Sequence, residues 1–130
     1  MNYFIKKIPL LSLVLFLVFF AEGCRKDFSA TAEHKASYGW EMYETSDFIK
    51  SKEWFANSVL SDDKWKDGYN GLGWSQAKLL ELDSVDIENI GSIRSFHRGL
   101  SQPKDPWNST DVHLELLAGL TFAYHAKGKN

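Results

Sequence analysis

A short motif recurs in this chain at a fixed spacing, and that spacing constrains the fold more than any other feature. Tyr38-Gly39-Trp40 and Leu72-Gly73-Trp74 lie 34 residues apart. A third copy is Leu120-Thr121-Phe122, which is followed by Tyr124 and Gly128. A period between about 20 and 50 residues is typical of repeat proteins, in which each unit buries its apolar face against its neighbours. The chain is therefore expected to fold as a short array rather than as a generic helical bundle.

The repeated units are predicted to be helical. Strand-like alternation is absent, and the glycine, proline and Asn-Asp breaks come at the spacing of helix hairpins. Gly39 and Gly73 occupy the same register, although glycine in a helix costs about 1 kcal/mol relative to alanine. We interpret them as points where the second helix of a hairpin approaches closely. Phe55 and Phe96 are predicted to fill the space between the paired helices.

The 34-residue period and this Gly-aromatic register resemble the tetratricopeptide repeat. The resemblance implies an all-α fold in which antiparallel helix hairpins stack as a short α-solenoid. It places a first repeat at residues 32–65, a second at 66–105, and the first helix of a third at 112–130.

Two departures from the repeat pattern carry expectations of their own. The second repeat contains an insertion, Asp83 to Gly91, and Ile87, Ile90, Ile93, Phe96 and Leu100 recur at three- and four-residue steps. The insertion is therefore expected to lengthen the second helix. The third copy has only its first helix, so Leu117, Leu120 and Tyr124 are expected to lack a packing partner. The chain is expected either to belong to a longer array or to cover this face by forming a homodimer.

The N-terminal residues have the pattern of an export signal. Lys6 and Lys7 precede a run from Ile8 to Ala21 that is apolar except for Ser12 and is shorter than the roughly 20 residues of a spanning helix. Gly23 then precedes the only cysteine, Cys24, in a pattern that resembles the lipobox of bacterial lipoproteins. The resemblance implies removal of residues 1–23, attachment of acyl chains such as palmitate to Cys24, and a tether at residues 24–31. It implies a location in the bacterial cell envelope, anchored by lipid in the periplasm or at the outer membrane.

Composition and motifs exclude several classes of function. Lys plus Arg is 15 and Asp plus Glu is 17, a balance that argues against nucleic-acid binding through bulk positive charge. One cysteine allows no CxxC site, and the four histidines form no HExxH motif. Gly71 and Gly73 form a G-x-G without a third glycine, and no phosphate-binding loop is present. We therefore expect no catalytic residue, no metal site and no cofactor, and we expect that the chain is not an enzyme.

The remaining candidate is a binding groove. The repeat resemblance implies that ligands lie against the first helices. The residues predicted on that face are Trp40, Tyr43, Asn70, Trp74, Lys78, Phe122 and His125. Aromatic side chains with polar neighbours suit recognition of a peptide or a sugar, but the same spacing also fits aromatic residues of the core.

The sequence thus predicts an envelope-anchored helical-repeat scaffold that binds a protein or peptide partner without catalysis. Two alternatives stay open. One is a glycan-binding lipoprotein of a nutrient-uptake system, and the other is an accessory or inhibitor subunit of an envelope enzyme.

Overall fold

The computed structural model describes residues 29–83, 90–103 and 111–128, and this part of the chain is helical without strands. Its five helices are α2 (Ala32–Glu44), α3 (Phe48–Ser61), α4 (Lys66–Lys78), α5 (Ser92–Ser101) and α6 (Val112–Lys127). The prediction of an all-α fold is confirmed. None of the described helices has the length and apolar character needed to cross a membrane. The predicted signal segment 1–23, Cys24 and Ile87 lie outside the described residues.

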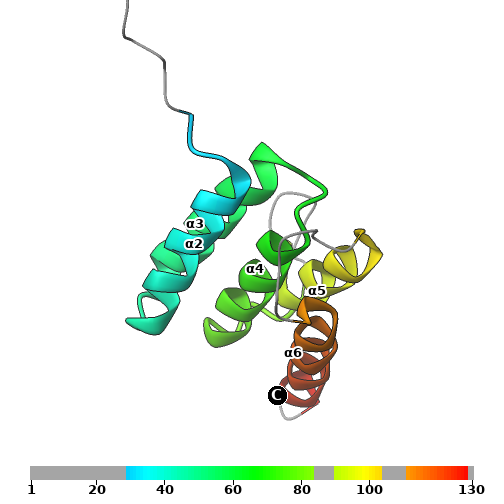
Figure 1. Ribbon diagram of the computed structural model, residues 1–130. Coiled ribbons are helices and arrows are strands. Elements are labelled where there is room, and N and C mark those ends of the chain that lie inside the picture. The colour runs from blue at the N-terminus through cyan, green and yellow to red at the C-terminus, as the bar shows by residue number, and fades with distance from the viewer. Residues whose placement is uncertain (1–28, 84–89, 104–110, 129–130) are drawn as a thin grey trace, which may run out of the picture.

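Helices that follow one another in the chain pack against one another. In addition, α4 lies between α2 and α6 and contacts both (Figure 1). The two helices α3 and α5 both contact α4 but do not contact each other. This arrangement leaves a space over α4, between α3 and α5.

The turns that end α2 and α4 have the same geometry, 34 residues apart. Ser46 and Leu80 are the two non-glycine residues with positive φ in the described chain, at 64° and 60°. The amide of Ser46 donates to the Tyr43 carbonyl, and the amide of Leu80 donates in the same way to the Ala77 carbonyl. A left-handed residue directly after the helix satisfies the last free carbonyls and reverses the chain.

Polar side chains define the beginnings of three helices. The side chains of Thr31, Asp47 and Asp111 accept hydrogen bonds from the backbone amides of His34, Lys50 and Leu114. Each bond satisfies an amide that lacks a partner within its own helix. At Asp47, the hydrogen bonds from Lys50 also hold the pKa of the carboxyl below its ordinary value.

Two phenylalanines form the centres of the packing. Phe55 and Phe96 are both fully buried. A Cβ added at Gly39 or Gly71 would lie 2.8 or 2.1 Å from the Phe55 ring, and one added at Gly73 would lie 2.5 Å from the Phe96 ring. The predicted close approach at Gly39 and Gly73, and the predicted place of both phenylalanines between helices, are confirmed.

Gly119 completes the socket of the second phenylalanine, because a Cβ there would lie 2.4 Å from the Phe96 ring. Phe96 also belongs to an aliphatic cluster with Leu82, Val112, Leu116 and Ala123. Leu120 is half-buried and packs against this cluster. The expectation that Leu120 lacks a packing partner is therefore wrong. It is also wrong for Tyr124, which is half exposed but contacts His97 of α5, with its hydroxyl 3.3 Å from His97 Nε2. Leu117 is exposed.

The expectation that the second helix of the second repeat extends through the insertion is wrong at both described ends of the insertion. Asp83 and Ile90 are not helical, and α5 begins at Ser92 with Gly91 as its N-cap. The physical reason is that the chain before the insertion supplies acceptors to the start of α5. The amide of Ser92 donates to the Glu81 carbonyl at 2.8 Å, so the first turn of α5 is held without a preceding helical turn.

Candidate functional site

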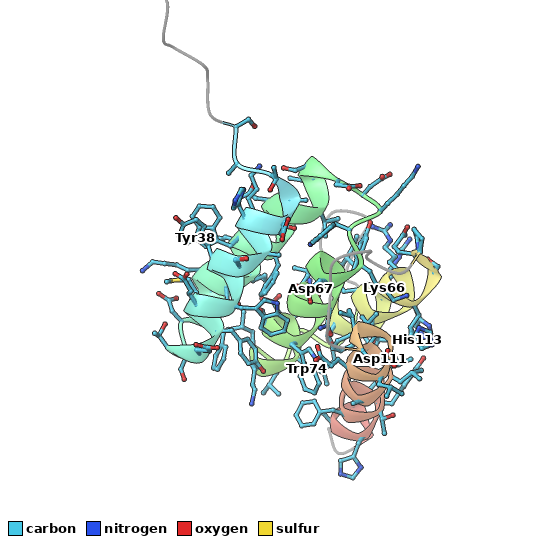
Figure 2. The ribbon with its side chains drawn as sticks, in the orientation of Figure 1. Tyr38, Lys66, Asp67, Trp74, Asp111 and His113 are labelled. Atoms are coloured by element: carbon cyan, nitrogen blue, oxygen red, sulfur yellow. The ribbon has the colours of Figure 1, made fainter. Side chains whose placement is uncertain are left out.

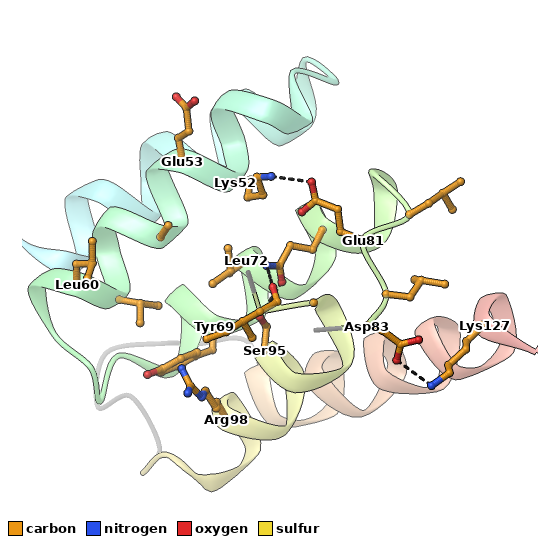
Figure 3. Close-up of a pocket in the computed structure, with 17 residues that line it drawn as sticks. Lys52, Glu53, Leu60, Tyr69, Leu72, Glu81, Asp83, Ser95, Arg98 and Lys127 are labelled. Atoms are coloured by element: carbon orange, nitrogen blue, oxygen red, sulfur yellow. Dashed lines mark hydrogen bonds and ion pairs between the residues drawn. The ribbon is translucent and has the colours of Figure 1, made fainter. Parts of the chain in front are cut away.

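A concave feature lies in the space between α3 and α5, and we call it the α3–α5 groove (Figure 3). Its volume is about 1090 Å³. Residues of α3 and α5 form its two sides, α4 forms its floor, and the chain after α4 closes one end. A groove of this size is at the upper end of the range of ordinary ligand pockets and has room for several side chains of a bound segment.

The inner lining of the groove is mainly apolar. It includes Val59 on one side, Leu72 in the floor and Ile90 at the closed end. The one amide in the floor, Gln76, is already occupied, because its Oε1 accepts a hydrogen bond from Ser95 at 2.7 Å and its Nε2 donates to the Ile90 carbonyl. The floor therefore offers contact area rather than free polar groups.

Two ion pairs border the groove. Lys52 on α3 pairs with Glu81 at 2.7 Å, and Lys127 on α6 pairs with Asp83 at 2.8 Å (Figure 3). The hydrogen bond from Lys127 to Asp83 raises the pKa of that lysine. Both pairs join segments far apart in sequence, so they tie the edges of the groove to the connection after α4.

Arg98 is the remaining cationic group at the groove. It lies beside Tyr69 (Figure 3) and forms no ion pair within the part of the chain that the structure describes. Burial raises the pKa of Tyr69, while the positive charge of Arg98 acts in the opposite direction. The Arg98 end of the groove can therefore accept an anionic group.

Two leucines project at the edge of the groove. Leu60 is 83% exposed and Leu80 is 67% exposed. Leu80 is also held in the left-handed conformation, which disfavours a side chain by about 1–2 kcal/mol. Ser46, at the same place in the first hairpin, is a small polar residue, so the turn itself does not require leucine. Strained residues cluster at functional sites, and Leu80 lines the same groove as Leu60.

The seven groove residues predicted from the sequence lie elsewhere, since not one of them is part of the lining of the α3–α5 groove. Trp40 and Trp74 are half-buried and pack edge-on against the buried phenylalanines, with ring centroids 4.9 Å from Phe55 and 5.7 Å from Phe96. The indole of Trp40 also donates to Asp67 at 3.0 Å. Both tryptophans thus contact the second helices, which was one of the two interpretations of their spacing.

Asn70 is fully buried and joins two helices. Its Nδ2 donates to Glu115 on α6 at 2.7 Å and to Asp67 at 3.4 Å. Because Trp40 on α2 donates to the same Asp67, a polar chain crosses α2, α4 and α6. Asn70 therefore has a packing role here and does not face solvent.

The other four predicted residues lie on α2, α4 and α6. Tyr43 is half-buried against Phe48, and burial raises its pKa. The Lys78 ammonium group lies over the ring of the same Phe48, 5.9 Å from its centroid. The ring centroid of Phe122 lies 5.9 Å from that of Trp74, which is labelled in Figure 2. His125 is exposed. Ring contacts join Trp40 to Tyr43 at 5.5 Å and Trp74 to Phe122 at 5.9 Å, so these predicted residues lie in contacting pairs on α2, α4 and α6, outside the α3–α5 groove.

The sequence did contain one signal for the α3–α5 groove. Val59 and Leu60 are adjacent apolar residues at the end of a helix, and only one of two neighbours can face a single packing partner. Leu80 gave no such signal, because its exposure depends on the left-handed turn.

Within the described residues there is no group of three histidine, cysteine, aspartate or glutamate side chains that could hold a metal ion. Two acidic groups of the groove edge, Glu81 and Asp83, are ion-paired, whereas Glu53 on α3 forms no ion pair within the described residues. The arrangement therefore suits binding through apolar contact with one charge interaction. Searches of protein-family models, curated proteins and solved structures gave no match to this chain.

Proposed function

We propose that this chain is a tetratricopeptide-like scaffold that holds a peptide segment of a partner protein in the α3–α5 groove, without catalysis. The observation that carries the proposal is the groove itself, an apolar floor left open between two helices that do not touch. Leu60 and Leu80 extend that apolar surface into solvent.

The burial pattern supports the repeat arrangement. On α2 the buried residues are Ala32, Ala36 and Gly39, and 34 positions later on α4 lie the buried residues Lys66, Asn70 and Gly73. On α6 the buried residues include Leu116, Gly119 and Ala123, and 48 positions earlier on α4 lie the buried residues Gly68, Gly71 and Ser75. The middle helix thus uses both faces, and each outer helix uses one, as in a stacked array.

The chemistry of the groove favours a peptide over a sugar. Sugar sites rely on aromatic platforms and free polar groups, whereas Tyr69 is buried and Gln76 is occupied. A segment with two or three apolar side chains would cover the floor, and an acidic side chain would face Arg98. The ligand class that fits is a short apolar segment with one acidic residue.

The position of the partner follows from the predicted anchor. A lipid on Cys24 would hold the scaffold at the bacterial envelope through several acyl chains, which anchor far more stably than one chain. Cys24→Ser is expected to move the protein from the detergent phase to the aqueous phase in a partition experiment, or to leave it unprocessed. Wild-type protein in the aqueous phase would contradict the anchor while leaving the groove proposal intact.

Site-specific photo-cross-linking tests the groove directly. A photoreactive amino acid is placed at Leu60, at Leu80 or at Ile49 of the full-length chain in living cells. Ile49 is the matched control, because it is an apolar residue of α3 that is 61% exposed but does not line the groove. We expect one and the same partner adduct from positions 60 and 80 and none from position 49.

Arg98→Glu in the same cross-linking background is expected to lower the adduct at least about tenfold, which corresponds to about 1.4 kcal/mol of binding. Adducts of equal yield at all three positions, or none at positions 60 and 80, would contradict the proposal. The mass of the cross-linked peptide identifies the partner.

A further inference from the structure

Helix α6 is apolar on the side that faces solvent as well as on the side that is buried. Its buried side consists of Val112, Leu116, Gly119 and Ala123. On its outer side Leu114 is 61% and Leu117 is 42% exposed. Phe122 at 43% and Tyr124 at 51% exposure flank that side, where their rings also contact Trp74 of α4 and His97 of α5. A helix that is apolar all round is normally covered on both sides, and a contiguous exposed apolar face marks an interaction surface.

The exposed face of α6 also carries no ionic charge of its own. Glu115 and Lys127 are the two residues of Val112–Lys127 that are charged at neutral pH. Glu115 accepts the hydrogen bond from Asn70 at 2.7 Å, and Lys127 pairs with Asp83 at 2.8 Å. Both charges are therefore engaged with other parts of the same chain, and the outer face presents no charge that a second identical face would repel.

The opposite end of the array is of a different character. Residues 34 positions before Gly68, Gly71 and Ser75 are His34, Ser37 and Glu41, and all three are exposed on α2. Stacking α6 of one copy on α2 of another would bury this polar surface against leucines at a cost in desolvation. Head-to-tail association is therefore disfavoured, and a contact that pairs α6 with α6 avoids this cost.

The residues of α6 also exclude the packing of a further helix like α3 or α5 on its outer face. Thr121 is in the register of Gly73, 48 positions earlier, and its side chain is exposed. Gly73 accepts a phenylalanine ring only because it has no Cβ, which would lie 2.5 Å from Phe96. Thr121 leaves no such socket, so the face suits a helix that lies flat across small residues.

We propose that a second copy of this chain covers the outer face of α6, with the two α6 helices antiparallel about a two-fold axis near Ala118 and Thr121. The small side chains at the axis allow close approach, and Leu117 of each copy then lies on the same flank of the interface as Leu117 of the other copy. The same patch serves both copies, as a two-fold interface requires. A helix of 16 residues is about 24 Å long. One helix pair therefore gives an interface near or below the lower limit of about 1,200 Å² for stable complexes, and the dimer depends on concentration.

Cysteine cross-linking in cells tests the axis and its direction. Ala118→Cys and Leu114→Cys are made separately in the full-length chain carrying Cys24→Ser, so that each variant has one thiol. A short bismaleimide should convert Ala118→Cys into a species of twice the chain mass. Leu114→Cys should react at least tenfold less, because antiparallel pairing places its two copies about 16 Å apart along the helices. Ser37→Cys, on the polar face of α2, is the matched control and should give no such species.

Leu117→Glu in the Ala118→Cys background should reduce the dimeric species at least tenfold with an unchanged melting temperature, because Leu117 is outside the buried side of α6. Equal cross-linking at positions 114 and 118, or a dimer that survives Leu117→Glu, would overturn the proposal. A cross-linked species with a mass other than twice that of the chain would identify another protein as the occupant. Protection of the position-118 thiol from an aqueous maleimide without any dimer would identify lipid as the occupant. Either result would also overturn the proposal.

Discussion

The Phe55 socket, formed where α2, α3 and α4 meet, and the Phe96 socket, formed where α4, α5 and α6 meet, hold the same ring in different surroundings. Around Phe55, the buried side chains of α2 and α3 are small. Two serines there donate to backbone carbonyls of α2, Ser51 to Gly39 at 2.9 Å and Ser58 to Ala32 at 2.7 Å. Phe96 instead belongs to the aliphatic cluster that links α5 to α6.

The comparison of the two sockets shows which contacts are common to both and therefore set the spacing of the helices. Each socket has glycine on two helices and a phenylalanine on the helix between them, and this combination sets how closely the helices approach. The rest of the contact area is filled either by hydroxyl groups that reach a neighbouring backbone or by aliphatic side chains. Serine suits the packing of α2 on α3, because a hydroxyl on a short side chain can reach a carbonyl of the facing helix.

Removing the rings gives the largest expected effect. Phe55→Ala and Phe96→Ala should each lower the free energy of unfolding by about 3–5 kcal/mol. Phe55→Ala should be at the upper end, since the glycines around the cavity have no side chain and the serine hydroxyls are held by hydrogen bonds to backbone carbonyls. Phe96→Ala should be at the lower end, since Leu82 and Leu116 of the cluster can partly fill the space.

Urea denaturation of the two variants measures both values on one scale. Because a domain of this size has about 5–15 kcal/mol of stability in total, both melting temperatures should fall sharply. A larger loss for Phe96→Ala would show that the aliphatic cluster is more rigid than the serine-rich packing. Losses near zero at both sites would contradict the sockets themselves.

Filling the glycine side of each socket should have an intermediate effect. Gly71→Ala places a Cβ 2.1 Å from Phe55, and Gly119→Ala places one 2.4 Å from Phe96. Overpacking of this kind costs about 1–3 kcal/mol, and we expect the larger cost at position 71. Gly128→Ala is the matched control, because its nearest neighbours are at 3.6 Å and it should not lose stability.

A double variant sharpens this test. Phe55→Leu combined with Gly71→Ala should cost less than the sum of the two single changes, because the smaller side chain frees the space that the new methyl group needs. Strict additivity in thermal or urea unfolding would show that the two residues do not interact.

Replacing the buried serines gives the smallest expected effects. The change in unfolding free energy should differ in sign between the Phe55 half and the Phe96 half of the molecule. Ser51→Ala should cost about 0.5–1.5 kcal/mol, because its hydroxyl donates to Gly39 and lies 2.7 Å from the Ser75 hydroxyl. Ser92 is equally buried, but its hydroxyl has no hydrogen-bond partner among the described residues. Ser92→Ala should therefore leave the unfolding free energy unchanged or raise it slightly. Equal losses for the two variants in urea unfolding would contradict this distinction.

The elements that the sequence predicted well are those that depend on local spacing. The all-α fold, the close approach at Gly39 and Gly73, and the burial of Phe55 and Phe96 follow from residue types at fixed helical intervals. The start of α5 did not follow, because the Glu81 carbonyl that receives the Ser92 amide is 11 residues away and its position depends on the turn after α4. The burial of Asn70 also depends on a distant residue, Glu115 on α6.

By itself, the sequence determined that helices would pair through glycine and phenylalanine, since that contact needs only a missing Cβ facing an aromatic ring at the right register. Only the tertiary structure decided which side of the helices stays open. The separation of α3 from α5 results from all the contacts that both helices make with α4, including the ring of Phe55 against Gly71 and of Phe96 against Gly73. No local pattern encodes that separation, because it is a property of three helices packed at once.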